Sequence, residues 1–346
     1  MSIALKDLTF SVRYMEVMAG LLNERGAPIK VLLDALRLTE SQLHDPHQTI
    51  DGEQYQRALV AALPYCWPGQ SLSSHYLEHV PLTITGPLGL LLMACGSLDE
   101  ALTAVERYVT ALFPAYFMRK EVIKDEVHVV VSRLSDFGEV DDLLTEIVLG
   151  MFTKYQPFLA EPLRGFELHF RHQQGPQGMA LPGSMISKVH YGALVDKVVF
   201  PKRLMAIKVA TQSRVMQVEV TRTLDQLLNQ DLQARPCSQQ TIRVIRDLMD
   251  AGKDLHGDVV AERMGLSRRT LNRRLQEEGN TVAGVTTTVR MSFAETLLLT
   301  TSLPMGDIAR RAGYSEVTNF SRAFKRVYGC SPSACRLNAF QKVAVT

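Results

Sequence analysis

The sequence predicts an α+β N-terminal domain followed by an all-α C-terminal domain, in which a long helix joins two helix-turn-helix units. Three observations carry this prediction. One pattern of residue roles occurs in residues 258–279 and again in residues 307–329. The net charge changes sign between the two parts of the chain. Segments that alternate between apolar and polar residues, as strands do, lie in the first two thirds.

The composition is that of an ordinary globular protein. The 346 residues are enough for two domains with a buried core each, and hydrophobic residues make up 46% of the chain. It holds no apolar run of the roughly 18 residues that span a bilayer, and the N-terminal segment lacks the pattern of a secretory signal. We therefore expect a cytoplasmic protein without a membrane partner. Five scattered cysteines indicate neither disulfides nor a zinc site, and we expect no cofactor.

The charge is divided unevenly along the chain. From Pro236 onward there are 16 Lys and Arg against 10 Asp and Glu, a net charge of +6. The residues before Pro236 hold 22 basic and 26 acidic side chains, a net charge of −4. A basic part attached to an acidic remainder is typical of a nucleic-acid-binding module joined to a domain of another kind.

Residues 258–279 predict two short helices joined by a tight turn. Asp258 is the expected N-cap of the first helix, and Gly265 supplies the left-handed residue that ends it. Ser267 can cap the next helix. Such a pair is a helix-turn-helix, in which the second helix is the recognition helix.

The second helix of this pair has two distinct faces. Leu271 and Leu275 lie one turn apart and face inward together. At about 100° per residue, basic and amide side chains then face outward. Arg can donate twice to guanine, and Asn or Gln can pair twice with adenine. The predicted DNA-contacting residues of this unit are Arg268, Arg269, Asn272, Arg273 and Gln276.

Residues 307–329 repeat the same geometry. Gly313 ends the supporting helix, and Phe320 and Phe324 form the inward stripe. Their spacing favours core packing of these rings over stacking on bases. The predicted DNA-contacting residues of this second unit are Thr318, Asn319, Ser321, Arg322 and Lys325.

The segment between the two copies predicts one connecting helix. Its apolar residues keep a helical spacing over about 15 residues, or roughly 22 Å. The threonines at 286–288 are poor helix formers, so the pattern leaves the start of this helix open. A helix of this length could hold two recognition helices about one DNA turn apart on one side of the duplex.

The motifs "VVAERMGLSRRTLNRRLQEEG" and "GDIARRAGYSEVTNFSRAFKRVYGCSP" make residues 241–337 similar to the DNA-binding domain of the AraC/XylS family of bacterial transcription regulators. The chain departs from the family pattern at Cys335, where an aromatic residue is common before the last arginine. The resemblance implies a sequence-specific regulator, in most members an activator. It implies double-stranded DNA, RNA polymerase and a small-molecule effector as partners, and it leaves a homodimer open.

The N-terminal part reads as a mixed α+β domain. Ser97 and Glu100 have the spacing of a capping box at the start of an amphipathic helix. Residues 126–134, 166–172 and 197–201 have strand patterns. Residues 11–210 resemble the arabinose-binding-type N-terminal domain of the branch that includes the ornithine-utilisation regulators, which implies effector sensing or dimerisation.

These patterns divide the chain into three parts. We expect a sensing or dimerisation domain in residues 1–230, a linker in residues 231–240 and the DNA-binding domain in residues 241–340. The sequence patterns do not identify the effector or the residues that contact it.

The sequence offers three other interpretations. His75 with His79, and His169 with His172, could each contribute to a metal site, but ordinary histidines are favoured and no metal is expected. An alkylation-repair methyltransferase would carry the same DNA-binding module. That chemistry needs a Pro-Cys-His-Arg motif, whereas Cys237 is followed by Ser and Gln, so we expect no catalytic residue and no enzyme.

Overall fold

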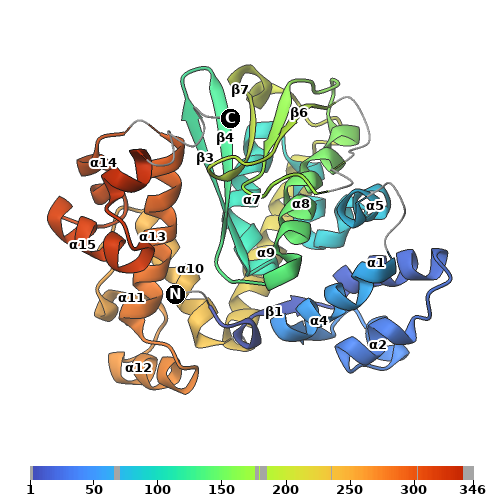
Figure 1. The fold of residues 1–346 in the computed structure, drawn as a ribbon, viewed down its shortest axis with the longest axis horizontal. Helices are drawn as coiled ribbons and strands as arrows, with labels where there is room; N and C mark the ends of the chain where they lie inside the picture. Colours follow the sequence, from blue (N-terminus) through green and yellow to red (C-terminus); the bar gives the residue numbers. More distant parts are fainter. Residues whose placement is uncertain are drawn as a thin grey trace.

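A computed structural model describes residues 3–65, 71–175, 179, 185–234, 236–301 and 303–337. An N-terminal domain of helices and sheet is followed by a helical C-terminal region (Figure 1). The elements of the N-terminal domain are η1 Leu5–Asp7, β1 Thr9–Ser11, α1 Arg13–Glu24, α2 Lys30–Leu36, α3 Glu40–Leu43, β2 Thr49–Asp51, α4 Gly52–Ala62, η2 Leu63–Tyr65, α5 Leu72–His79, η3 Leu82–Thr85, α6 Pro87–Ala94, α7 Leu98–Leu112, β3 Tyr116–Ile123, β4 Glu126–Arg133, η4 Gly138–Val140, α8 Asp141–Gly150, η5 Met151–Phe158, β5 Phe166–His169, β6 Ile186–His190, β7 Asp196–Pro201, η6 Lys202–Ala206 and α9 Arg214–Ala234.

The C-terminal region is helical. Its helices are α10 Cys237–Asp250, α11 Gly257–Arg263, α12 Arg268–Glu277, α13 Val282–Thr300, α14 Met305–Arg311 and α15 Val317–Tyr328, and residues 332–337 are helical as well. We call α11 with α12 the first helix pair, and α14 with α15 the second helix pair. Residues 231–240 cover the end of α9 and the start of α10.

The main sheet has five strands in the order β3-β4-β7-β5-β6. Neighbouring strands are antiparallel except β5 and β6, which are parallel. The predicted strands at 126–134, 166–172 and 197–201 are confirmed as β4, β5 and β7, although β5 ends at His169. A separate two-stranded sheet pairs β1 with β2.

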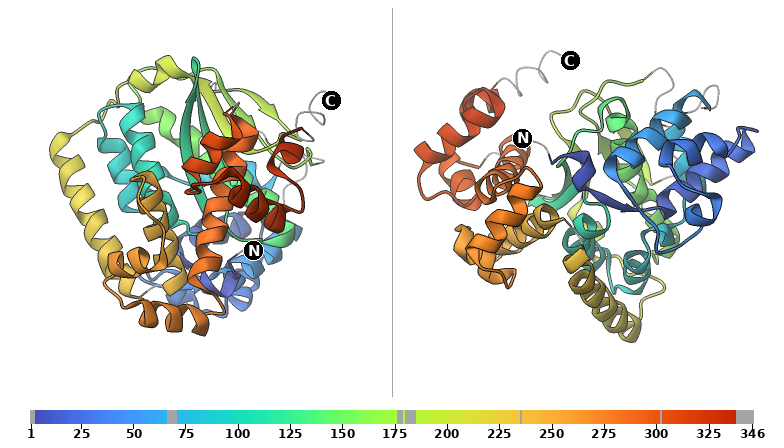
Figure 2. Two further views of the ribbon diagram at one scale, coloured as in Figure 1. Left: turned by 90° about the vertical axis from the view of Figure 1, so that its left-hand side faces the viewer. Right: turned by 90° about the horizontal axis from the view of Figure 1, so that it is seen from below.

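Helix α7 packs along β3, and α8 packs on β7 and α5 (Figures 1 and 2). The predicted capping box before α7 is only half formed. Ser97 Oγ accepts from the backbone N–H of Glu100 at 3.3 Å, whereas the carboxylate of Glu100 accepts from the N–H of Gly96 at 2.9 Å. The helix still begins at Leu98, because one accepted bond is enough to cap its first turn.

Helix α13 is longer than predicted. It spans 19 residues, about 28 Å at 1.5 Å per residue, and Thr281 caps its start by accepting from the N–H of Gly284. The three threonines at 286–288 lie inside the helix. Each donates its hydroxyl to the carbonyl four residues earlier, so these poor helix formers are accommodated by bonds to the backbone.

Glu278, which follows α12, forms hydrogen bonds between the first helix pair and α10. Its carboxylate accepts from the backbone N–H groups of Cys237 and Ser238, the latter at 2.8 Å. These are unpaired donors at the start of α10, where a negative charge is favourable. The carboxylate therefore stabilises the N-terminus of α10 against the end of α12.

The C-terminal helices lie against the β3–β4 edge of the sheet (Figures 1 and 2). The guanidinium carbon of Arg119 in β3 lies 4.3 Å from the ring centroid of Phe293 in α13. The hydroxyls of Ser132 in β4 and Thr296 in α13 are hydrogen-bonded at 2.8 Å. Buried apolar side chains of both parts belong to one continuous core cluster.

Candidate nucleic-acid interface and ligand cavity

The first helix pair has the predicted inward and outward faces. Leu271 and Leu275 are fully buried, and Ser267 caps α12 by accepting from the N–H of Thr270 at 3.1 Å. Gly265 has the left-handed φ of 65° that the turn requires. Of the candidate DNA-contacting residues, Asn272 is half-buried, and the exposed ones are Arg268, Arg269, Arg273 and Gln276.

The prediction that Asp258 caps α11 is wrong. The N-cap is His256, and α11 begins at Gly257. The carboxylate of Asp258 instead lies 3.3 Å from the guanidinium of Arg268, at the start of α12. The helix begins one residue before Asp258, so this carboxylate lies in the first turn and not at the cap position.

Arg273 also has a carboxylate partner within the chain. Its Nη1 donates to Oε1 of Glu277 at 2.6 Å, one turn further along α12. Both side chains are well exposed, and an exposed pair of this kind contributes only a few tenths of a kcal/mol. Arg273 can therefore exchange this carboxylate for another acceptor at little cost.

The second helix pair has the same arrangement. Phe320 and Phe324 are fully buried, with ring centroids 5.8 Å apart, which confirms that these rings are core residues and do not stack on bases. Gly313 turns the chain with φ 79°. Among the candidates of this pair, Ser321 is half-buried and the exposed ones are Thr318, Asn319, Arg322 and Lys325.

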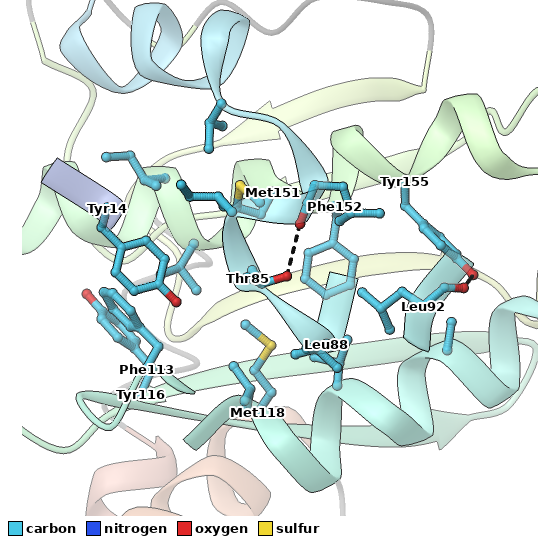
Figure 3. A pocket seen from close by; sticks show the side chains of 18 of the residues that line it. Tyr14, Thr85, Leu88, Leu92, Phe113, Tyr116, Met118, Met151, Phe152 and Tyr155 are labelled. Atoms are coloured by element: carbon cyan, nitrogen blue, oxygen red, sulfur yellow. Dashed lines mark hydrogen bonds between the residues drawn. The ribbon is translucent and has the colours of Figure 1, made fainter. Parts of the chain in front are cut away.

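The N-terminal domain contains an apolar cavity of about 140 Å³. Side chains of α1, α4, α5, α6, α7, α8, β3, η3 and η5 line it (Figure 3). Aliphatic and aromatic groups dominate the walls, and the polar atoms are hydroxyls of tyrosines and of Thr85. No sequence pattern predicted this cavity, because its walls come from elements far apart in the chain.

Two family models match the chain. The model described as a helix-turn-helix domain matches residues 260–338, and that of the arabinose-binding domain of AraC transcription regulators matches residues 26–209. The chain belongs to the AraC family of transcription regulators. It is accordingly a DNA-binding regulator of transcription, with an arabinose-binding-type N-terminal domain.

Relatives of this AraC-family regulator match along nearly the whole chain. An "Uncharacterized HTH-type transcriptional regulator" of Mycobacterium tuberculosis is 26% identical over 92% of this chain and 93% of its own length. The ornithine utilization regulator of Pseudomonas aeruginosa is 23% identical over 94% of this chain and 95% of its own. The crystal structure of the regulator CdpR of Pseudomonas aeruginosa is 18% identical, with a TM-score of 0.41 over 92% of this chain and 97% of that one.

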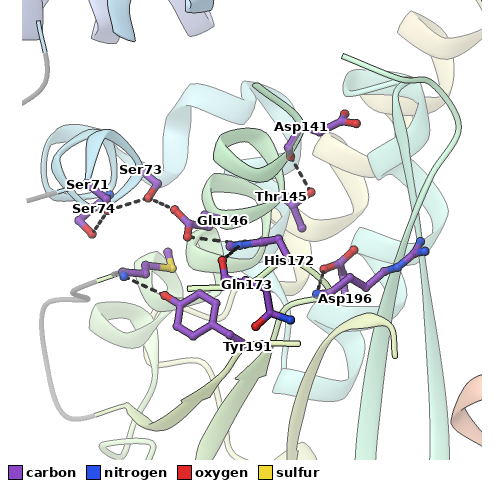
Figure 4. Close-up of polar contacts among 12 residues, drawn as sticks. Ser71, Ser73, Ser74, Asp141, Thr145, Glu146, His172, Gln173, Tyr191 and Asp196 are labelled. Carbon is purple, nitrogen blue, oxygen red and sulfur yellow. Dashed lines mark hydrogen bonds and ion pairs between the residues drawn. The ribbon is translucent and has the colours of Figure 1, made fainter. Parts of the chain in front are cut away.

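The structure of this AraC-family chain separates His169 from His172. His172 points toward Glu146 of α8, with Nε2 and Oε1 3.6 Å apart, while Ser73 donates its hydroxyl to the same carboxylate (Figure 4). Burial raises the pKa of Glu146. His169 stacks on His190 instead, with ring centroids 4.3 Å apart.

Two groups in the described part of this regulator bring possible metal ligands together. Glu24 of α1 joins His75 and His79 of α5, and Glu167 joins His169 and His190, with the ligand atoms of each group within 4.8 Å of one another. The His75–His79 spacing was noticed in the sequence. The approach of Glu24 was missed, because the packing of α1 on α5 is a tertiary contact.

Cys237 of this regulator is a poor nucleophile. Its side chain is buried, and burial together with the neighbouring carboxylate of Glu278 raises the pKa of the thiol. Alkyl transfer requires the opposite, a stabilised thiolate.

Among the described residues, no helix is both long enough and apolar enough to cross a membrane.

Proposed function

We propose that this regulator is an effector-responsive activator whose two helix pairs are helix-turn-helix units joined by α13. In this arrangement, α12 and α15 are recognition helices that read adjacent segments of the major groove. The observation that carries the proposal is the duplicated geometry. Arg273 and Arg322 occupy equivalent outward positions, and each lies opposite a fully buried apolar stripe.

The proposed DNA-contacting side chains are those predicted from the repeat, and we propose the division into residues 1–230, 231–240 and 241–340. Arg, Asn, Gln, Thr and Ser can all bond to base edges or phosphates. Helix α13, about 28 Å long, connects the two helix pairs, and recognition helices that enter successive major grooves on one side of the duplex lie roughly 34–36 Å apart. RNA polymerase is the partner that an activator engages, and we propose no catalytic role.

The test is a base-by-base binding measurement on one operator with Arg273→Ala and Arg322→Ala. Each substitution should cost roughly 1–3 kcal/mol of binding free energy and relax specificity at its own positions. Arg164→Ala, which removes an exposed arginine of the N-terminal domain, is the charge-matched control. Loss at the same positions with both recognition-helix variants, or a uniform loss without positional change, would contradict the two-site proposal.

We also propose that α9 mediates a homodimer. Helix α9 exposes several apolar side chains that water contacts in the monomer, namely Val215, Met216, Val218 and Leu227. Apolar surface of this kind is covered when two copies associate. In sedimentation experiments, Val218→Glu should weaken self-association, whereas Leu337→Glu, at an exposed apolar residue near the C-terminus, should not.

A further inference from the structure

The ligand of the apolar cavity can be inferred from its size and chemistry. A volume of about 140 Å³ is close to the roughly 150 Å³ of an engineered apolar cavity in another protein that binds benzene. This space accommodates about one aromatic ring with a short substituent. Amphipathic molecules of larger size would extend beyond it.

The walls exclude charged ligands. None of the described residues that line the cavity carries a charge, so a carboxylate or an ammonium group would lose its hydration without gaining a partner. This argues against amino acids and against organic acids. Ionised groups of this kind bind where a countercharge is built into the site.

The walls also offer too few polar partners for a sugar. Tyr155 donates its hydroxyl to the carbonyl of Leu92 at 2.6 Å, and Thr85 donates to the carbonyl of Leu82 at 2.9 Å (Figure 3). Tyr76 donates to the carbonyl of Tyr14. Because these hydroxyl protons are engaged, the several hydroxyls of a sugar would be buried with few acceptors and donors.

We propose that the cavity binds a small, uncharged, apolar molecule about the size of one aromatic ring. The inference rests on the proposed effector-responsive function and assigns the chemical class of the effector. Burial of the ring's apolar surface supplies the affinity. The ligand can carry at most one hydroxyl or ring N–H, which a tyrosine oxygen of the cavity would accept as a hydrogen bond.

Strand β3 connects this cavity to the DNA-binding part. Its side chains alternate, so Tyr116 and Met118 face the cavity while Phe117 and Arg119 face the C-terminal helices. The guanidinium of Arg246 in α10 lies over the ring of Phe117, 4.7 Å from its centroid. A ligand that displaces Met118 or Tyr116 therefore acts on a strand whose other face carries the contact with α10 and α13.

Helix α7 provides a second connection. Val105 and Val109 line the cavity. On another side of the same helix, the hydroxyl of Thr110 and the carbonyl of Glu106 accept from the guanidinium of Arg246. Strand β3 and helix α7, which both line the cavity, thus both contact Arg246 of α10. We therefore expect ligand binding to change operator affinity by about fivefold or more, a usual size for coupled sites.

The test uses the full chain with defined probes. Indole, toluene and benzyl alcohol should raise the melting temperature in a concentration-dependent way, because a ligand that binds only the folded form stabilises it. Benzoate, L-arabinose and L-ornithine at the same concentrations should not. A rise with the second set but not the first would overturn the assignment while leaving effector sensing intact.

Two variants test the location of the site. Ala101→Leu adds volume inside the cavity and should weaken indole binding at least about tenfold, because the added carbons occupy the space of the ring. Thr103→Leu adds a similar bulk on the exposed side of α7 and should leave binding unchanged. If Ala101→Leu does not fold, Leu88→Ala enlarges the cavity instead, and preference should move from toluene toward naphthalene.

The DNA measurement is kept separate from the ligand measurement. Operator affinity without ligand tests the proposed recognition helices, and its loss would contradict the proposed function. Unchanged binding of indole to Ala101→Leu, or failure of every apolar probe to bind, would overturn the assignment of the cavity alone. Binding of indole with no effect on operator affinity would overturn the connection through β3 and α7.

Discussion

Oε2 of Glu121 in β3 lies 3.6 Å from Nη1 of Arg311, the last residue of α14. The other carboxylate oxygen of Glu121 accepts from Nε of Arg119 at 3.2 Å. One carboxylate of the N-terminal domain thus contacts a cation of its own strand and a cation of the second helix pair. Glu121 is 15% exposed and Arg311 is 48% exposed, so solvent reaches this contact only from the side of the arginine.

Substitution of Glu121 should therefore loosen the contact between the two parts of the chain. Glu121→Gln is expected to lower the free energy of unfolding by about 1 kcal/mol, with a smaller effect at high salt. In a protein that already carries Arg311→Gln, the same substitution should lower the free energy of unfolding by less. A double-mutant cycle measures this difference. Glu126→Gln on β4 is the control, because that carboxylate is 60% exposed.

Ser267 and Ser315 are equivalent in the repeat but differ in the structure. Ser267 caps α12, whereas the N-cap of α15 is Glu316, which makes no side-chain cap bond. Ser267→Ala should cost about 1 kcal/mol of stability. Ser315→Ala should be nearly neutral. Equal losses from the two substitutions in denaturant titrations would contradict this difference in capping.

The buried rings of the second helix pair should contribute strongly to stability. Phe324→Ala is expected to lower the free energy of unfolding by roughly 3–5 kcal/mol, because it leaves a large cavity in a packed core. Phe320→Ala should behave similarly, since both rings are fully buried. Wild-type stability combined with weakened DNA binding would place these rings on the DNA side of the helix.

His169 should make the fold sensitive to acid. Burial, followed by the nearby charge of Lys197, lowers the pKa of its imidazole from 6.5 to about 3. The unfolded chain takes up this proton first, so stability should fall as the pH drops below 6.5 toward 3. His169→Asn should flatten the profile in this range. His47→Asn, at an exposed histidine of the N-terminal domain, is the matched control.

The helix pairs could be predicted from the sequence because their signals are local. The turn glycines, the cap at Ser267 and the inward stripes depend on residues within a few positions of one another. The error at Asp258 concerns the helix boundary, since α11 begins at Gly257 and places Asp258 in its first turn. The approach of Glu24 in α1 to the two histidines of α5 is a tertiary contact, which no local pattern reveals.

Strand β3 was missed for a related reason. One face lies under α7 and beside the cavity, and the other is covered by the C-terminal helices. Its first residues, Tyr116–Met118, are all buried, so the strand begins without the alternation by which strands are found in a sequence. The cavity could not be predicted either, because its walls meet only after the chain has folded.

The carboxylate of Glu278 has a consequence for recombining this protein with its relatives. It accepts from the first N–H groups of α10, so α10 needs the end of α12 to complete its own N-terminus. A graft that begins inside α10 would leave the backbone N–H groups of Cys237 and Ser238 without their acceptor and the carboxylate of Glu278 without its donors. Exchange of DNA-binding parts between such regulators should succeed with a junction at Pro236, directly before α10 begins. A junction a turn or two later should yield insoluble chimeras.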